Sequence, residues 1–158
     1  MDQINLLSNL PKNMGQLSKV QYLSLQNNFL STLDEQIGQL NALEVLNLSG
    51  NQLSVLPDAL SECSNLKELI LYGNVIRTLP ENISNLKNII GINLCNNHLN
   101  RLPDGFGALD HLENIDLVDN NFEVFPEILS QLKAIKKIFI DPQLNGPISL
   151  NSVLAIYD

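Results

Sequence analysis

Large apolar residues return along this chain at a fixed spacing, with polar residues between them. One stretch carries them at Leu43, Leu46, Leu48, Leu53, Leu56 and Leu60. The next stretch carries them at the same intervals, at Leu66, Leu69, Leu71, Ile76, Leu79 and Ile83. Leu46 and Leu48 flank a single polar residue, which is the period of a strand with one buried face. We therefore predict one short strand in each repeat.

Asparagine and proline follow the same spacing. An asparagine recurs at one constant step, at Asn5, Asn28, Asn51, Asn74, Asn97 and Asn120. Proline recurs at Pro11, Pro57, Pro80, Pro103 and Pro126, and Asp34 is the exception. The asparagine amide carries both donors and an acceptor, so it can satisfy backbone groups of its own and neighbouring turns. Proline suits the first position of a short helical turn. We predict an asparagine ladder and one or two helical or 3-10 turns per unit.

A unit of this size cannot bury its own leucines. Stacked units bury them against each other and form one continuous core. Since neighbouring parallel strands lie ~4.8 Å apart, we expect a sheet of about six strands with a concave face. The segments on the convex side are bulkier than the strands, which should curve the sheet.

The unit that begins at Leu43 reads Leu-x-x-Leu-x-Leu-x-x-Asn-x-Leu-x-x-Leu-Pro. It resembles the leucine-rich repeat family, in the Leu-Pro variant whose units run about 23 residues, and the resemblance covers residues 5 to about 140. The resemblance implies an α/β solenoid shaped as a curved horseshoe, with a concave parallel sheet and convex short helical or 3-10 segments. The chain is similar to intracellular members of this family, either Ras-suppressor-like scaffolds or bacterial effector arrays. These imply a small GTPase or another signalling protein as partner.

The two ends depart from the repeat. We expect a single domain over 1–158, with an N-terminal half-repeat or cap at 1–16, repeats at 17–140 and a C-terminal cap at 141–158. Asp2 stands where the register predicts a leucine, and Pro142 and Pro147 interrupt the last unit. The apolar tail should cover the last repeat, because terminal repeats shield an otherwise open core.

Alternate strand positions face the concave side and are free of packing in the core. Nine residues at or just after these positions form the predicted partner-binding surface: Tyr22, Glu68, Ile70, Tyr72, Asn93, Asn114, Asp116, Val118 and Phe139. They combine an aromatic and aliphatic centre with a polar rim, and tyrosine is a common interface anchor. The alternative is a face without a partner, since scattered exposed apolar residues are normal. Lys133, Lys136 and Lys137 add a basic spot near the last strand.

Composition narrows the function further. The 158 residues include 17 acidic and 9 basic ones, for a net charge of −8. An acidic chain repels phosphate backbones, so we expect no nucleic acid partner. No apolar run approaches the ~20 residues that span a bilayer, and no basic segment suggests a secretory signal. Two cysteines are too few for a disulfide scaffold and indicate a reducing compartment. We expect a cytoplasmic monomer, or an effector delivered into a host cytosol.

Candidate catalytic chemistry is sparse. Cys95 and His98 lie close together in the chain, but a nucleophile and base need a third, orienting group, and Asn97 belongs to the ladder. Cys63 stands at a core position, and His111 lies on a convex loop without an evident partner. We therefore expect a non-catalytic interaction module without cofactor or metal. One alternative is the substrate-recognition arm of a longer enzyme, such as an effector ubiquitin ligase. Another is self-association through an end or the concave face.

Overall fold

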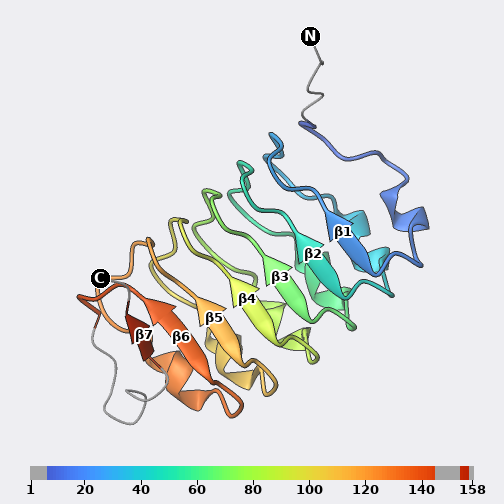
Figure 1. Ribbon diagram of the computed structural model, residues 1–158. Coiled ribbons are helices and arrows are strands. Elements are labelled where there is room, and N and C mark those ends of the chain that lie inside the picture. The colour runs from blue at the N-terminus through green and yellow to red at the C-terminus, as the bar shows by residue number, and fades with distance from the viewer. Residues whose placement is uncertain (1–6, 145–153, 157–158) are drawn as a thin grey trace.

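Parallel strands in one open sheet run through the protein (Figure 1). The computed structural model describes residues 7–144 and 154–156. Strand order in the sheet follows chain order from β1 to β7. The strands are β1 (Tyr22–Ser24), β2 (Val45–Asn47), β3 (Glu68–Ile70), β4 (Gly91–Asn93), β5 (Asn114–Asp116), β6 (Lys137–Ile140) and β7 (Leu154–Ile156).

The pairing register repeats the spacing of the sequence. Leu23 pairs with Leu46, and Ile115 pairs with Ile138, so each residue pairs with its equivalent in the next repeat. The expected strands are therefore confirmed, and β7 adds a seventh. It pairs in parallel with β6 and lies inside the segment expected to be a cap, so part of that segment extends the sheet. Other parts of the expected caps, at residues 1–6, 145–153 and 157–158, lie outside the described residues.

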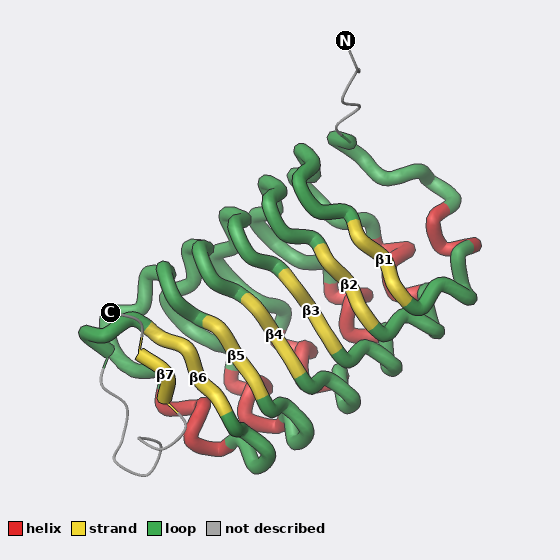
Figure 2. The backbone as a smooth tube through the Cα atoms, in the orientation of Figure 1, coloured by secondary structure: helices red, strands yellow, loops and turns green. Residues whose placement is uncertain are grey.

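Short 3-10 segments cover one face of the sheet (Figure 2). They are η1 (Met14–Gln16), η2 (Glu35–Gln39), η3 (Asp58–Glu62), η4 (Glu81–Asn85), η5 (Asp104–Ala108) and η6 (Glu127–Gln131). In the described part of the chain, none of the helices is long and apolar enough to cross a membrane.

The recurring proline stands one residue earlier than expected. Pro57 and Pro80 precede their 3-10 segments, with φ of −70° and −64° and an extended ψ. Proline therefore fixes the residue before the turn, and the turn itself begins with an acidic residue. Asp34 takes the same place before η2, where its side chain accepts a hydrogen bond of 2.8 Å from the Gln36 N–H. A capping bond thus replaces the stiffness of proline at this position.

The leucines of the repeat fill one continuous core that runs from Met14 to Leu144. Leu46, Leu48 and Leu60 have no exposed surface. Cys63 is fully buried as well, as its position in the repeat predicts. Since the buried central residues of the strands, such as Leu46, Leu69 and Ile115, pack in this core on the side of the 3-10 segments, the opposite face of the sheet is left for other contacts.

The asparagine ladder is confirmed along the described repeats. Asn51 Nδ2 donates to the carbonyls of Leu25 and Leu48 at 2.9 Å each, and Asn51 Oδ1 accepts from the Leu30 N–H at 3.0 Å. Corresponding bonds are made by Asn74, Asn97 and Asn120. Each amide ties its own turn to the preceding repeat. The expected first member, Asn5, lies outside the described residues.

The residue before each ladder asparagine has a positive φ. The values are 56° at Asn27, 63° at Gly50, 66° at Gly73, 54° at Asn96 and 55° at Asp119. Glycine, asparagine and aspartate are the residues that enter this left-handed region most readily. Pro142 stands at the next equivalent position, and its ring does not allow a positive φ. The regular turn therefore cannot form again after β6.

Candidate protein-binding face

The face of the sheet opposite the 3-10 segments, here called the sheet face, is built from alternate strand residues. In β2, β3 and β5 the central residue is buried and its two neighbours are half-buried. The outer residues form two lines across the sheet. One runs through Tyr22, Val45, Glu68, Gly91, Asn114 and Lys137, and the other through Ser24, Asn47, Ile70, Asn93, Asp116 and Phe139.

A shallow hollow of about 160 Å³ lies on the sheet face over β3, β4 and β5. Six of the nine predicted site residues line it, namely Glu68, Ile70, Asn93, Asn114, Asp116 and Phe139. Gly91, Ile92 and Ile115 complete the lining. The structure thus brings together most of the predicted residues around one depression in the sheet.

Gly91 makes this depression, and sequence reasoning missed it. It is buried and carries no side chain, and its register partner on β3 is Glu68. A Cβ atom at Gly91 would overlap the Glu68 carboxylate, so that carboxylate lies over the glycine. The available signal was that Gly91 is the one glycine in the first line of sheet-face residues.

The three remaining predicted residues lie outside the hollow. Tyr22 is on β1, two strands away from β3, and its side chain is 62% exposed. Tyr72 and Val118 follow β3 and β5, and Tyr72 is 48% exposed. The predicted aromatic and aliphatic centre is therefore divided. Ile70 and Phe139 belong to the hollow, while the two tyrosines stand apart from it.

The hollow carries two carboxylates in a partly desolvated setting. Burial raises the pKa of Glu68, and the structure gives its carboxylate no hydrogen bond or ion pair among the described residues. Burial also raises the pKa of Asp116, against the opposing effect of the hydrogen bond that the Val118 N–H donates to it at 3.2 Å. Asp119 and Asp141 add like charge that raises the Asp116 pKa further. The hollow is therefore an acidic site.

Asp141 follows β6 directly and is largely buried. It is 9% exposed, and its Oδ1 accepts a hydrogen bond of 3.0 Å from the Asp119 N–H. The carboxylate binds the last regular turn to β6, so it serves the fold as well as the charge of this face.

Cys95 is not poised as a nucleophile. Burial, together with the charges of Asp116, Asp119 and Asp141, raises the pKa of the thiol to about 11. An activated cysteine needs the opposite shift, because the thiolate is the reactive form. His98 Nδ1 lies 3.1 Å from the Asn97 carbonyl oxygen. Among the described residues, no three histidine, cysteine or acidic side chains are grouped so as to hold a metal ion.

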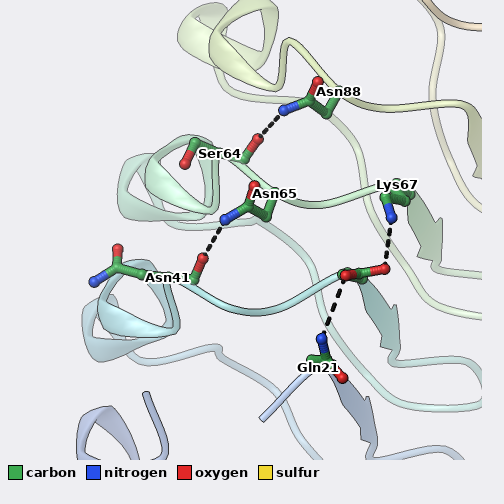
Figure 3. A network of polar contacts seen from close by, with 7 residues as sticks. Gln21, Asn41, Ser64, Asn65, Lys67 and Asn88 are labelled. Atoms are coloured by element: carbon green, nitrogen blue, oxygen red, sulfur yellow. Dashed lines mark hydrogen bonds and ion pairs between the residues drawn. The ribbon is translucent and has the colours of Figure 1, made fainter. Parts of the chain in front are cut away.

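The loops that precede the strands carry a second set of polar contacts (Figure 3). Glu44 accepts from Lys67 Nζ at 2.6 Å, and Asn65 Nδ2 donates to the Asn41 carbonyl at 2.7 Å. His111 was expected to lack a partner, and this was wrong. Its Nδ1 donates to the Lys87 carbonyl at 2.7 Å, at the same place in the repeat as Asn65. These side chains join neighbouring repeats and serve the fold.

The expected basic spot near the last strand is largely neutralised. Lys133 Nζ lies 3.0 Å from Asp110 and Lys136 Nζ lies 2.8 Å from Glu113. Lys137, the third of these lysines, occupies the end of the first line on the sheet face. The charge of the sheet face is therefore set mainly by its carboxylates.

Comparison with known proteins agrees with this architecture. A family model described as leucine rich repeat matches residues 3–53 and 18–76. The solved structure of a Leptospira interrogans leucine-rich repeat protein is similar over 95% of this chain, with a TM-score of 0.75 and 26% sequence identity. Both findings support a leucine-rich repeat architecture for this chain.

This leucine-rich repeat chain spans 47% of the length of that Leptospira protein. A search of curated proteins finds no match. In all, 291 chains of known structure match, so the architecture is widespread and does not by itself name a partner. Domains of this family generally mediate protein–protein interaction.

Proposed function

We propose that this protein is a non-catalytic interaction module that binds a protein partner through the sheet face. The observation that carries the proposal is the hollow over Gly91, where six predicted site residues converge. None of these six side chains is needed to fill the core, which consists of residues on the other side of the sheet. Extended sheet surfaces of solenoids commonly serve as binding surfaces.

Two candidate apolar anchors come from β3 and the turn after it. Ile70 lines the hollow, and Tyr72 lies outside it, two residues further along the chain, with 48% of its surface exposed. A tyrosine in such a position buries a large area on binding at a small entropic cost, and interfaces are enriched in it. We therefore assign the apolar contacts of the proposed surface to Ile70, inside the acidic hollow, and to Tyr72, outside it.

The module acts in a reducing compartment, within a signalling scaffold or as an effector in a host cytosol. Two free cysteines support this setting, because one is buried in the core and the other is half-buried. A small GTPase or a comparable signalling protein is the partner class that the resemblance to intracellular leucine-rich repeat proteins implies. The partner must tolerate an acidic surface, since the chain carries a net charge of −8.

The test compares capture of proteins from a eukaryotic lysate by wild type and by the Ile70→Asp, Tyr72→Asp double variant. Val124→Asp is the matched control, because Val124 is a 75% exposed valine in the segment before η6. We expect a partner that binds wild type and the control but not the double variant, with all three folded by circular dichroism. If the double variant still binds the partner, the interface lies elsewhere than at Ile70 and Tyr72 on the sheet face.

A further inference from the structure

We propose that the hollow over Gly91 receives an arginine side chain of the protein partner. The inference rests on the proposed function, because it names the partner's contact at the same face. It starts from a charge that the described chain leaves uncompensated. The Glu68 carboxylate lies over Gly91 without a hydrogen bond or ion pair among the described residues. A partly buried carboxylate in this condition is stabilised strongly by a cationic donor.

A second carboxylate lies across the hollow. One oxygen of Asp116 accepts from the Val118 N–H, and the structure gives its other oxygen no partner in the described part of the chain. Asp119 and Asp141 lie near enough to add to the negative potential. The one basic residue in the two lines of the sheet face is Lys137, which does not line the hollow. The hollow therefore lacks a cation of its own.

The remaining lining suits a planar cation on a long apolar stem. Asn93 Oδ1 already accepts from the Cys95 N–H at 3.0 Å. The Asn114 amide makes no hydrogen bond in the described chain, so its oxygen is available to a donor. Ile70 and Phe139, which line the hollow from the sheet face, supply apolar surface. Arginine buries its methylene groups against such surfaces and keeps its guanidinium at the polar groups.

Size and spacing favour arginine over other ligands. The hollow of about 160 Å³ is smaller than the roughly 300–1,000 Å³ of small-molecule sites, so it fits the end of one side chain. Glu68 and Asp116 come from strands two positions apart, which places their backbones roughly 10 Å from each other. Arginine carries five donors in a planar fork and can reach acceptors on opposite sides, whereas lysine is a point charge.

The first test uses the whole chain and a small probe. Acetyl-arginine amide is titrated while proton–nitrogen NMR follows the Gly91 backbone and the side-chain amides of Asn93 and Asn114. Acetyl-citrulline amide, which has the same shape without the charge, is the ligand control. We expect saturable shifts at these three residues with arginine and none with citrulline. Equal shifts with both ligands, or no shift at Gly91, would overturn the proposal.

Two variants test separately whether arginine binding needs the charge of Glu68 and the free volume over Gly91. Glu68→Gln should weaken arginine binding roughly tenfold, and Gly91→Ala should abolish it by placing a methyl group where the carboxylate lies. Glu123→Gln is the matched control, since Glu123 is exposed and lies outside the hollow. Unchanged binding in Glu68→Gln, with its fold intact, contradicts the inference.

A third arm distinguishes failure of this inference from failure of the proposed function. Peptides are selected from a random display library on wild type and retested on the Ile70→Asp, Tyr72→Asp variant and on Glu68→Gln. Peptides rich in arginine that bind wild type and lose binding to Glu68→Gln support the inference. If the selected peptides lack arginine, tolerate Glu68→Gln and are lost on the double variant, the sheet face binds protein and the arginine site is wrong. If the arginine amide binds but lysate partners survive the double variant, the arginine site stands and the proposed function fails.

Discussion

The carboxylate of Glu68 lies over Gly91, its register partner on the neighbouring strand. Every other residue of that line across the sheet carries a side chain. The missing side chain makes room for the carboxylate and leaves the sheet hollowed at this point. The charge and the shape of the candidate site therefore depend on a single pair of residues.

We expect Gly91→Ala to leave the fold nearly as stable as wild type. Gly91 does not have a positive φ, so alanine fits the strand backbone. Alanine also restricts the unfolded chain, which favours folding by about 0.4–1 kcal/mol. This gain opposes the displacement of the flexible end of Glu68. Denaturant unfolding should show a change below about 1 kcal/mol. A much larger loss would mean that the hollow has a structural role.

Glu68 should make stability depend on pH in a direction opposite to that of a salt-bridged acid. Burial raises its pKa in the folded chain above the reference value of 4.5. The folded chain then binds the proton more tightly than the unfolded chain. The contribution of Glu68 to the free energy of unfolding therefore falls as pH rises through the interval between the two values.

The corresponding variant is Glu68→Gln, which removes this titration. Its melting temperature should exceed that of wild type at neutral pH, and the difference should shrink well below pH 4.5. Thermal unfolding at a series of pH values measures both. A variant less stable than wild type at neutral pH would show that Glu68 has a stabilising partner. A more stable Glu68→Gln variant, together with arginine binding to wild type, would show that Glu68 lowers stability in exchange for binding.

The asparagine ladder should be the most sensitive polar element of the fold. Asn74 is 5% exposed, and its amide bonds to the Leu48 and Leu71 carbonyls and the Leu53 N–H. Asn74→Ala leaves the buried Leu53 N–H without its partner, while the Leu48 and Leu71 carbonyls each keep one bond, from Asn51 and Asn97. We expect a loss on the order of 2 kcal/mol in the free energy of unfolding.

Asn88→Ala is the control for the ladder variant. Asn88 makes one exposed hydrogen bond, of 2.8 Å, to the Ser64 carbonyl, as Figure 3 shows. Its replacement should cost less than about 0.5 kcal/mol. Equal losses for the two variants in denaturant unfolding would refute the distinction between the buried ladder and the loop contacts.

The residue before each ladder asparagine has a positive φ, so the stability of variants at this position should follow how readily each residue adopts a positive φ. Gly73 has φ of 66°, and a Cβ atom there would meet no atom closer than 3.7 Å. Gly73→Ala therefore tests conformation alone, with an expected loss of about 1 kcal/mol. Gly73→Asn should lose less, because Asn96 occupies the equivalent position at φ of 54°. Chemical denaturation of both variants would decide, and an alanine variant as stable as the asparagine one would contradict the argument.

Sequence reasoning found the solenoid and its ladder because a strict period constrains every position at once. Asn28, Asn51 and Asn74 could be assigned a shared role before any coordinates, since only equivalent turns explain their spacing. The left-handed positions were missed because Asn27, Gly50 and Asp119 are of three residue types. They share a backbone preference that a search for identical residues does not detect.

The sequence by itself determined the repeat, the buried leucines, the ladder and the set of residues free to face a partner, because each follows from the period within one unit and its copies. The tertiary structure decided which of those residues meet. Glu68, Gly91, Asn114 and Asp116 come from three strands, and their grouping depends on the absence of a side chain on the middle one. That grouping depends on contacts between neighbouring repeats at one place in the sheet. At this place Gly91 stands where the other repeats carry a side chain.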